Sequence, residues 1–592
     1  MQLRLLTNGN IGLLLCALFA LDGQHRQALS ADAEGIPKTP AAAVQPPTTP
    51  PLKYRAVTDR IPRPLPELTK LGAAGSSFQD SIFGTRLIRV TDENIIPEFK
   101  GAPYLTMPNG MNTEWNADST KFAVSLLNGI TVIFSFDPGA FRTQLMMDPK
   151  DRKHYLDARR FEMFSFSDPN VYYATGGSGH TAEAYNLATG KTSLIVDWDR
   201  LIPTKNLPAT YYTMGLSADI TSAIFSTAIG GVQQSHPYVV VYNSSTKQSA
   251  VLDVVNSQVR MFGSATFAPT NYQMGYGVHS AFLDRSGRYV QITRGSPIHP
   301  KANPHMAQDV IWDTQTGTVT PMTTHWPGHN AIGYGTLVNM GGTQSGQDSD
   351  AWWLRRLDDV NQPSEVALPE VVAPNRWTTD GHPSWNNARS RPNTPFAQEV
   401  YVIDSQNPYF PLRAWDGEII AVATDGSNTV WRFAHHRSIQ GGFYDTPRAN
   451  ISQDGRYVLF TSNWENSLGK DPSGGHRLDV FLVELDQKYP PAPVADSTPP
   501  KKPEFLHVKP NETVSGVVDF TATATDNAGV VAMNYRLGTN LQGAEIPAPF
   551  TFKLDTAKLS EGEHRIEAIA RDAQYNVSVS DPLIFYVERS AH

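Results

Sequence analysis

Apolar and polar residues alternate along most of this chain in short runs, which predicts β-strands joined by tight turns. One strand–turn–strand phrase recurs, and its clearest copy is ISQDGRYVLF at residues 451–460. In this copy an Asp-Gly turn separates two apolar strands, as expected for a β-hairpin. Related copies begin at Trp115, Phe164, Leu216 and Phe282.

A second phrase follows several of these copies and consists of an apolar strand, a polar turn and another strand. It occurs at residues 184–191, 240–247 and 310–317. Two hairpins per unit, repeated roughly every 50–60 residues, are typical of propeller blades. We therefore predict an all-β fold in which residues 76–488 form a β-propeller of seven blades, with eight blades as the alternative. A large β-sandwich or barrel is the other interpretation, and the periodic hairpins disfavour it.

The strands that carry the Ser-x-Asp-Gly-Arg sequence, as at Ser452, resemble the repeat of the TolB-type, WD40-like propellers. The resemblance covers the region from residue 76 to residue 488. It implies a propeller fold, and it is specific for that fold rather than for an activity.

Residues 499–590 read as a separate unit with strands of alternating pattern at 514–530, 548–556 and 561–572. These strands resemble a bacterial immunoglobulin-like domain of the kind appended to secreted and surface proteins. Their regular spacing independently predicts a β-sandwich. Such domains usually space or attach a neighbouring module, and the fold alone assigns them no ligand.

The two ends of the propeller region adjoin segments of different composition. Residues 1–31 contain an apolar run at 11–20 preceded by Arg4 and followed by small residues, which indicates a secretory signal peptide. The run is too short to span a bilayer comfortably, and no later segment is predicted to be transmembrane. Residues 32–75 and 489–498 are rich in proline and are predicted to be linkers. We therefore expect an extracytoplasmic protein, either secreted or periplasmic.

The cysteine content and the net charge exclude some kinds of chemistry and argue against one class of partner. The one cysteine, Cys16, lies inside the apolar run, so the cleaved protein has no disulfide, thiolate ligand or cysteine nucleophile. A lipoprotein interpretation would acylate Cys16, but Leu15 stands where a small residue is expected. The net charge of −8 over 592 residues is spread without basic runs, which argues against nucleic acid as a partner.

Histidines near the predicted starts of the inner strands are the main candidates for chemistry, because loops from every blade converge there around the central channel. We predict a shared site with His279, His382, Tyr444 and Arg448 as catalytic residues, and with His329, His435 and His436 as ligands of a divalent metal ion. Neutral imidazoles bind such ions or act as general bases, and arginine pairs with carboxylates. No other cofactor site is predicted. In the alternative interpretation, each histidine packs in its hairpin and bonds a neighbouring blade. No short metal-binding spacing such as His-x-His supports the ligand set.

The predicted propeller with this histidine set also resembles the oligogalacturonate lyases and the ulvan-type polysaccharide lyases in architecture and residue types. That resemblance implies β-elimination on a uronic acid, in which one group neutralises the carboxylate and a base removes the C5 proton. It implies a polysaccharide or another cell-surface ligand as the partner, and in some of these families a metal held by histidines. The alternative function is a non-catalytic, TolB-like protein-interaction scaffold. The sequence leaves the oligomeric state open.

Overall fold

The computed structural model describes residues 51–588, except 52, 62, 64, 69, 107–112, 128, 149–152, 155–159, 178, 203–211, 232–234, 275, 298–308, 324–328, 341–351, 368–378, 389–393, 403–413, 486–497, 528, 539, 542–545 and 573–576. The predicted signal peptide and all but the last residue of the second proline-rich linker lie outside the described residues. Regular structure in the described part is β, with a few short 3-10 turns, so the all-β prediction is confirmed.

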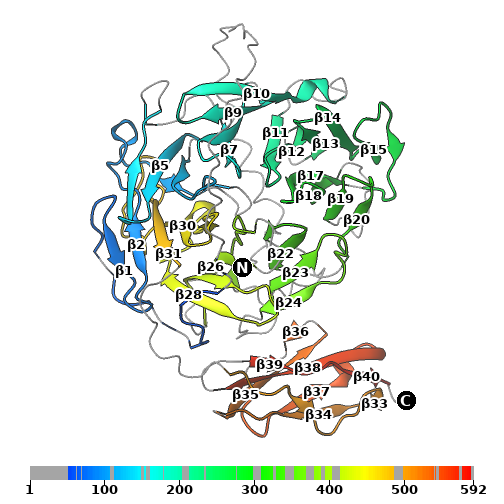
Figure 1. Ribbon diagram of the computed structural model, residues 1–592. Coiled ribbons are helices and arrows are strands. Elements are labelled where there is room, and N and C mark those ends of the chain that lie inside the picture. The colour runs from blue at the N-terminus through cyan, green and yellow to red at the C-terminus, as the bar shows by residue number, and fades with distance from the viewer. Residues whose placement is uncertain are drawn as a thin grey trace, which may run out of the picture.

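Antiparallel sheets between residues 77 and 484 surround a common centre, as Figure 1 shows. The first contains β3 (Tyr104–Leu105), β4 (Lys121–Leu126), β5 (Thr131–Asp137) and β6 (Arg142–Leu145). The second contains β7 (Arg160–Phe164), β8 (Val171–Thr175), β9 (Thr181–Asn186) and β10 (Lys191–Asp197). This arrangement of small sheets around one axis is that of a β-propeller.

Two further groups of strands form a ten-stranded sheet, and among the described residues the strand pairing between the groups is that of His236 with Val278. One group contains β11 (Tyr212–Ala218), β12 (Ile224–Gly231), β13 (Ser235–Asn243), β14 (Gln248–Asp253), β15 (Gln258–Arg260) and β16 (Ala268–Pro269). The other contains β17 (Tyr276–Leu283), β18 (Tyr289–Pro297), β19 (Val310–Asp313) and β20 (Val319–Pro321).

Three further sheets belong to the ring. One contains β21 (Asn330–Ile332), β22 (Thr336–Met340), β23 (Trp352–Arg356) and β24 (Ser364–Ala367). The next contains β25 (Thr379–Asp380), β26 (Phe396–Val402), β27 (Glu418–Val422) and β28 (Val430–His435). The last contains β29 (Asn450–Ile451), β30 (Tyr457–Ser462), β31 (Asp479–Glu484), β2 (Arg86–Arg89) and β1 (Ser77–Gln79). It therefore joins the beginning of the ring to its end, with Leu87 opposite Val483.

Local polar contacts explain why the recurring phrase forms a hairpin. The Asp284 carboxylate accepts backbone N–H bonds from Arg288 and Tyr289 at 3.0 and 2.8 Å, which closes the turn after β17. Gly287 in this turn has a φ of +78°, and a Cβ there would lie 2.8 Å from Ile224 Cδ1. Glycine is favoured at this position chiefly by the positive φ, since the tip of the Ile224 side chain could move aside.

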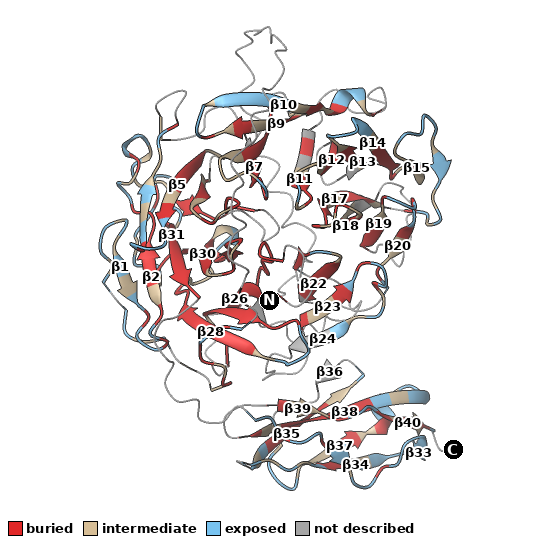
Figure 2. Ribbon diagram, viewed as in Figure 1, coloured by how far each residue is buried: buried red, intermediate tan, exposed pale blue. Residues whose placement is uncertain are grey.

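Burial differs from one sheet of the ring to another, even between the edge strands β28 and β10. Figure 2 shows β2, β28 and β31 buried along much of their length, whereas β10 exposes much of its surface. The apolar residues between the sheets supply the hydrophobic stabilisation of the ring.

The C-terminal unit is a sandwich of two sheets. One sheet contains β32 (Glu504–Phe505), β34 (Val517–Thr523) and β37 (Thr551–Asp555). The other contains β33 (Glu512–Val514), β35 (Val530–Leu537), β36 (Asn540–Leu541), β38 (Gly562–Asp572), β39 (Val577–Val579) and β40 (Leu583–Val587). Phe520, Tyr535, Ile566 and Phe585 fill the space between them.

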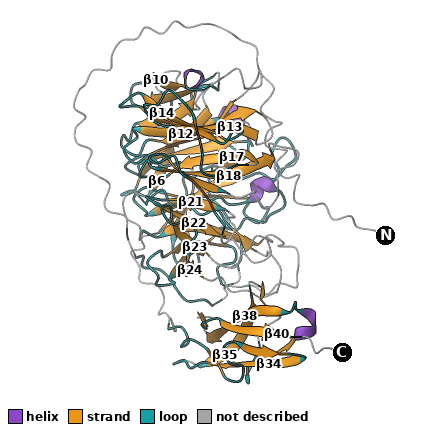
Figure 3. Cartoon of the chain, turned by 90° about the vertical axis from the view of Figure 1, so that its right-hand side faces the viewer, coloured by secondary structure: helices purple, strands orange, loops and turns teal. Residues whose placement is uncertain are grey.

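The sandwich contacts the ring directly. Trp353 on β23 packs against a small cluster made by Ile569, Val577 and Val579 of the sandwich. Figure 3 shows the sandwich beside the end of the ring that carries β24. No helix in the described part of the chain is long and apolar enough to cross a bilayer.

Candidate functional site

Glu399 on β26 brings together two of the predicted site residues, His382 and Arg448. Its Oε1 atom lies 2.5 Å from His382 Nδ1 and accepts backbone N–H bonds from His382 at 3.0 Å and from Arg448 at 3.1 Å. Its Oε2 atom accepts the N–H of Ala449 at 2.7 Å. One carboxylate thus connects the segment after β25 with the start of β29, and His382, Glu399 and Arg448 are all buried.

These contacts determine the tautomer of His382. Both oxygens of Glu399 already accept backbone N–H bonds, so the carboxylate acts as an acceptor and His382 Nδ1 is the donor. The basic nitrogen of the neutral imidazole is therefore Nε2. A carboxylate that accepts from Nδ1 fixes both the tautomer and the orientation of the ring.

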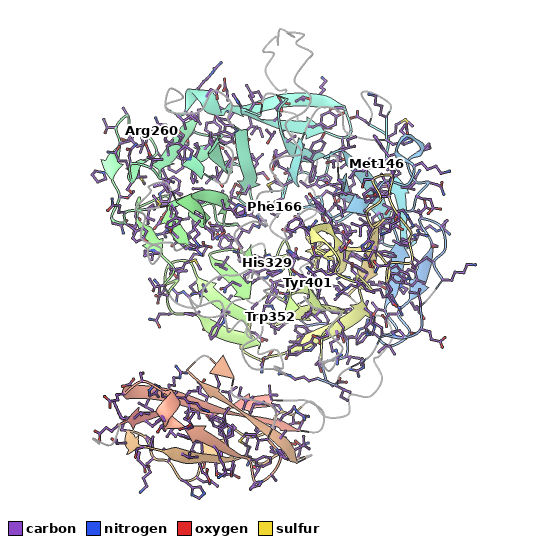
Figure 4. The ribbon with its side chains drawn as sticks, turned by 180° about the vertical axis from the view of Figure 1, so that it is seen from behind. Met146, Phe166, Arg260, His329, Trp352 and Tyr401 are labelled. Carbon is purple, nitrogen blue, oxygen red and sulfur yellow. The ribbon has the colours of Figure 1, made fainter. Side chains whose placement is uncertain are left out.

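Three aromatic rings form a stack beside this pair. The His329 and His382 rings lie 4.3 Å apart at 27°, and the Tyr401 ring lies 5.8 Å from His382 at 19°. His329 Nδ1 is 3.0 Å from the carbonyl oxygen of Gly381, which can only accept, so this nitrogen is the donor. His329 is exposed whereas His382 and Tyr401 are buried, so the stack runs from the surface inward. Figure 4 shows His329 and Tyr401 close together near the centre of the ring.

Arg448 is a buried cation with few partners. Its Nη2 atom donates to the carbonyl oxygen of Phe443 at 2.8 Å, and its Nε atom is buried without a partner. No carboxylate in the described part of the chain forms an ion pair with it. Burial lowers the pKa of Arg448 to about 10, so the guanidinium stays charged at neutral pH. A buried charge that lacks a counter-ion is costly, which favours a ligand site here.

The loop before β29 covers Arg448. The guanidinium carbon lies 5.0 Å from the ring centre of Phe443 and 5.5 Å from that of Tyr444. Phe443 is 45% exposed and Tyr444 is half-buried. Arg448 itself has a φ of +52°, a conformation that costs free energy in a residue with a side chain and is enriched at functional sites. Tyr444 and Arg448 therefore lie together at the edge of the His382 cluster.

His435 and His436 lie at the end of β28 and bind different parts of the fold. His435 Nδ1 is 3.1 Å from Asp80 Oδ2, and its Nε2 is 3.3 Å from the carbonyl oxygen of Arg63. His436 Nε2 donates to the carbonyl oxygen of Val400 at 3.1 Å, and its Nδ1 accepts the N–H of Ser438 at 3.0 Å. Burial lowers the pKa of His436 to about 4, so this ring is neutral.

His279 lies on β17 and is half-buried. Its Nδ1 atom is buried without a partner among the described residues, and burial lowers its pKa. No hydrogen bond, ion pair or ring contact joins His279 to His382 or Arg448. The structure thus brings His329, His382, Tyr444 and Arg448 into one neighbourhood and places His279, His435 and His436 outside these contacts.

The described residues do not fit a divalent metal ion. They contain no group of three or more His, Cys, Asp or Glu side chains that could hold one. His329 and His382 face each other as stacked rings, an arrangement in which the in-plane lone pairs do not converge. The ring nitrogens of His435 and His436 already face protein partners. The metal stays a prediction, and no chemical step below depends on it.

Comparison with known proteins identifies the C-terminal sandwich. Residues 508–568 match the bacterial Ig domain family. The C-terminal sandwich is a bacterial Ig domain. This match confirms the prediction made for that part of the chain. No curated protein matches the chain.

Solved structures similar to this chain include propellers of low identity. An oligogalacturonate lyase in complex with manganese is 13% identical and covers 73% of this chain and 99% of its own, with a TM-score of 0.43. The oligogalacturonate lyase of Vibrio parahaemolyticus is 10% identical over 73% of this chain and 100% of its own, with a TM-score of 0.43. The Swd1 β-propeller domain of Myceliophteria thermophila is 10% identical over 56% of this chain and 95% of its own, with a TM-score of 0.28.

The bacterial Ig domain contains none of the predicted site residues, all of which lie in the propeller. Two site residues were missed in the sequence, namely Glu399 and Tyr401. Both lie on β26, whose sequence FAQEVYV reads as an apolar strand. The signal that could have identified them is the polar pair Gln398 and Glu399 inside an otherwise apolar strand, because a buried carboxylate needs a specific partner.

Proposed function

We propose that this protein is a secreted or periplasmic β-propeller that binds a uronate-containing polysaccharide and cleaves it by β-elimination. One observation carries the proposal: a buried arginine with no carboxylate partner, Arg448, lies beside a histidine that a carboxylate orients, His382. A positive charge that lacks a counter-ion suits the carboxylate of a uronic acid. A histidine with a basic Nε2 suits proton removal from carbon.

The proposed propeller has seven blades. The ten-stranded sheet counts as two of them, because a single β-pairing, His236 with Val278, links its two halves among the described residues. The seventh combines β29, β30 and β31 with β1 and β2 from the start of the ring. Sharing one blade between both ends of the propeller holds the ring closed.

In the proposed reaction Arg448 holds the uronate carboxylate and stabilises the negative charge that develops on it. His382 Nε2 takes the proton from C5, and the electron pair of that bond forms the C4–C5 double bond. The bond between C4 and the glycosidic oxygen breaks, and the hydroxyl of Tyr444 protonates the departing oxygen. Because Phe443 and Tyr444 cover Arg448, the polysaccharide must displace these rings to reach the guanidinium.

A specific observation favours a second candidate, the non-catalytic scaffold. Glu399 accepts the backbone N–H groups of Arg448 and Ala449 as well as His382 Nδ1. In this candidate the only role of the His382–Glu399 pair is to attach β29 to β26. In that case the propeller face binds a protein or surface ligand without chemistry.

The experiment is a spectrophotometric assay for the unsaturated uronate product, with the full chain and a panel of uronic-acid polymers. We expect product with at least one polymer, and a loss of about 100-fold in kcat/KM for Arg448→Met and for His382→Gln. Arg200→Met, which alters an exposed arginine, is the matched control and should keep full activity.

Two outcomes separate the candidates. Polymer binding without product, tested with and without added divalent ions, would support the scaffold. The absence of both binding and product across the panel would overturn the polysaccharide proposal altogether.

A further inference from the structure

A second buried arginine, Arg285, lies where several sheets of the propeller meet. It follows β17 in the Asp-Arg-Ser-Gly turn, and only 2% of it is exposed. Its guanidinium carbon lies 4.4 Å from the ring centre of Phe166, which follows β7. Its Nη2 atom donates to Asn386 Oδ1 at 3.1 Å, and its backbone N–H donates to Gly333 at 2.9 Å. Figure 4 shows Phe166 near the centre of the ring.

The hydrogen bonds of this guanidinium are incomplete. An arginine side chain carries five N–H donors, and here Asn386 Oδ1 is the acceptor of one of them. The Nε atom is buried without a partner. No carboxylate in the described part of the chain forms an ion pair with Arg285. Burial lowers its pKa to about 10, so the group remains charged at neutral pH.

The nearest carboxylate along the chain, Asp284, has other partners. Its Oδ1 atom accepts the N–H groups of Arg288 and Tyr289, and its Oδ2 atom accepts those of Ser286 and Gly335. Four backbone bonds thus hold the Asp284 carboxylate in the turn. It cannot also turn toward the Arg285 guanidinium without breaking the hairpin.

The side-chain amide of Asn386 contacts Arg285 through an uncharged oxygen, and this oxygen accepts a second hydrogen bond as well. Asn386 Oδ1 also accepts the Thr113 hydroxyl at 3.2 Å. Its Nδ2 atom donates to Asn450 Oδ1 at 3.1 Å and to the Ser384 hydroxyl at 3.3 Å, which fixes the orientation of the amide. These contacts satisfy Asn386 but leave the charge of Arg285 uncompensated.

We propose that Arg285 binds a small monovalent anion of the chloride class near the axis of the propeller. A buried charge is costly unless it is paired, and no carboxylate of the described residues forms an ion pair with the Arg285 guanidinium. The anion is small because Phe166 and Asn386, which surround the guanidinium, are themselves buried. A sugar chain would have to displace core residues to reach it, whereas Arg448 lies beneath an exposed loop.

Thermal unfolding of the full-length protein tests the site, with chloride exchanged for gluconate at constant ionic strength. We expect the Tm to rise by about 2 °C in chloride, because a ligand that binds only the folded state stabilises it. Arg285→Met should abolish this rise. Arg355→Met is the matched control and should keep it, because Arg355 is equally buried but bonds Asn339 and Val360. No chloride response in the wild type, or an equal response in Arg285→Met, would overturn the proposal.

A second variant covers the case in which Arg285→Met fails to fold. Asn386→Asp places a carboxylate at the position now 3.1 Å from Arg285 Nη2 and so supplies an internal counter-ion. We expect this variant to unfold at the same temperature in chloride and in gluconate. Bromide-soaked crystals of the wild type should show an anomalous peak beside Arg285 Nε. A chloride response retained in Asn386→Asp, or a water molecule in place of bromide, would contradict the anion site.

Discussion

Arg432 and Arg448 are buried to nearly the same extent, at 0% and 2% exposed, but their surroundings are opposite. Arg432 on β28 donates to both carboxylate oxygens of Glu418 at 2.5 and 2.7 Å, and to Asp59 and Ile61 through Nη1. Arg448 donates one side-chain bond, to a carbonyl oxygen. The difference shows that burial alone does not separate structural charges from candidate binding groups. What separates these two classes of buried charge is whether the hydrogen-bond donors of the side chain all have partners.

The two arginines also differ in what lies over them. The segment around Val57 pairs with β28 at Arg432 and brings the Asp59 carboxylate with it. Arg448 is covered instead by two aromatic rings. Arg432, which is paired, attaches one segment of the chain to another. Arg448 has few hydrogen bonds and lies beneath Phe443 and Tyr444, so a ligand that displaces these two rings can bind its guanidinium.

The largest effect expected from this comparison is on stability when Arg432 is removed. Arg432→Met leaves Glu418 buried without its counter-charge and leaves Asp59 paired with Arg63, so we expect a loss of about 3–5 kcal/mol in the free energy of unfolding. Urea denaturation of the full chain measures it. Arg200→Met, whose side chain is 81% exposed, should change stability by less than about 0.5 kcal/mol. A loss below about 1 kcal/mol for Arg432→Met would break the distinction between the two arginines.

A smaller effect is expected from pH, through the fully bonded His436. Burial lowers its pKa to about 4 in the folded state, below the ordinary value of 6.5. Its contribution to stability is therefore complete above pH 6.5 and is lost as the pH falls toward 4, by at most about 1.4 kcal/mol for each pH unit. His436→Gln can keep both hydrogen bonds without titrating, so it should flatten the stability curve between pH 6.5 and 4.5. Parallel curves for the variant and the wild type would show that His436 is not the group that titrates.

The smallest effect on stability is expected at Arg448. Arg448→Met replaces an underpaired charge with an apolar side chain of similar length, so the free energy of unfolding should stay within about 1 kcal/mol of the wild type or rise. The same urea titration measures it. A loss as large as that expected for Arg432→Met would mean that Arg448 is a structural charge, and the proposed site would lose its cation.

The part of the fold that depends on local contacts was predictable from the sequence. Asp284 bonds residues four and five positions further along the chain, so the turn it closes is visible as a recurring phrase. The bacterial Ig domain was predictable for a similar reason, since its strands follow one another at regular spacing. The pairing of β2 with β31 was not predictable, because Leu87 and Val483 lie near opposite ends of the propeller region and pair only in the tertiary structure.

The candidate site was predictable only in part. His382, Tyr444 and Arg448 were expected to lie together, and the structure places them around one carboxylate and one loop. Glu399 was missed because it lies in a strand whose pattern reads as apolar. His435 and His436 seemed equivalent, but successive residues of an extended segment point to opposite sides, so the two rings bind different partners.

By itself the sequence determined the repeated hairpins, the Ig domain and the set of residues able to do chemistry, because these depend on neighbours along the chain. Only the tertiary structure decided which of the buried charges are paired. Arg432 meets Asp59 across 373 positions of sequence, whereas the Arg448 guanidinium forms no ion pair with a carboxylate of the described residues, and only its backbone N–H binds Glu399. Compensation of a buried charge depends on groups that folding brings near it, and the order of residues does not show which groups those are.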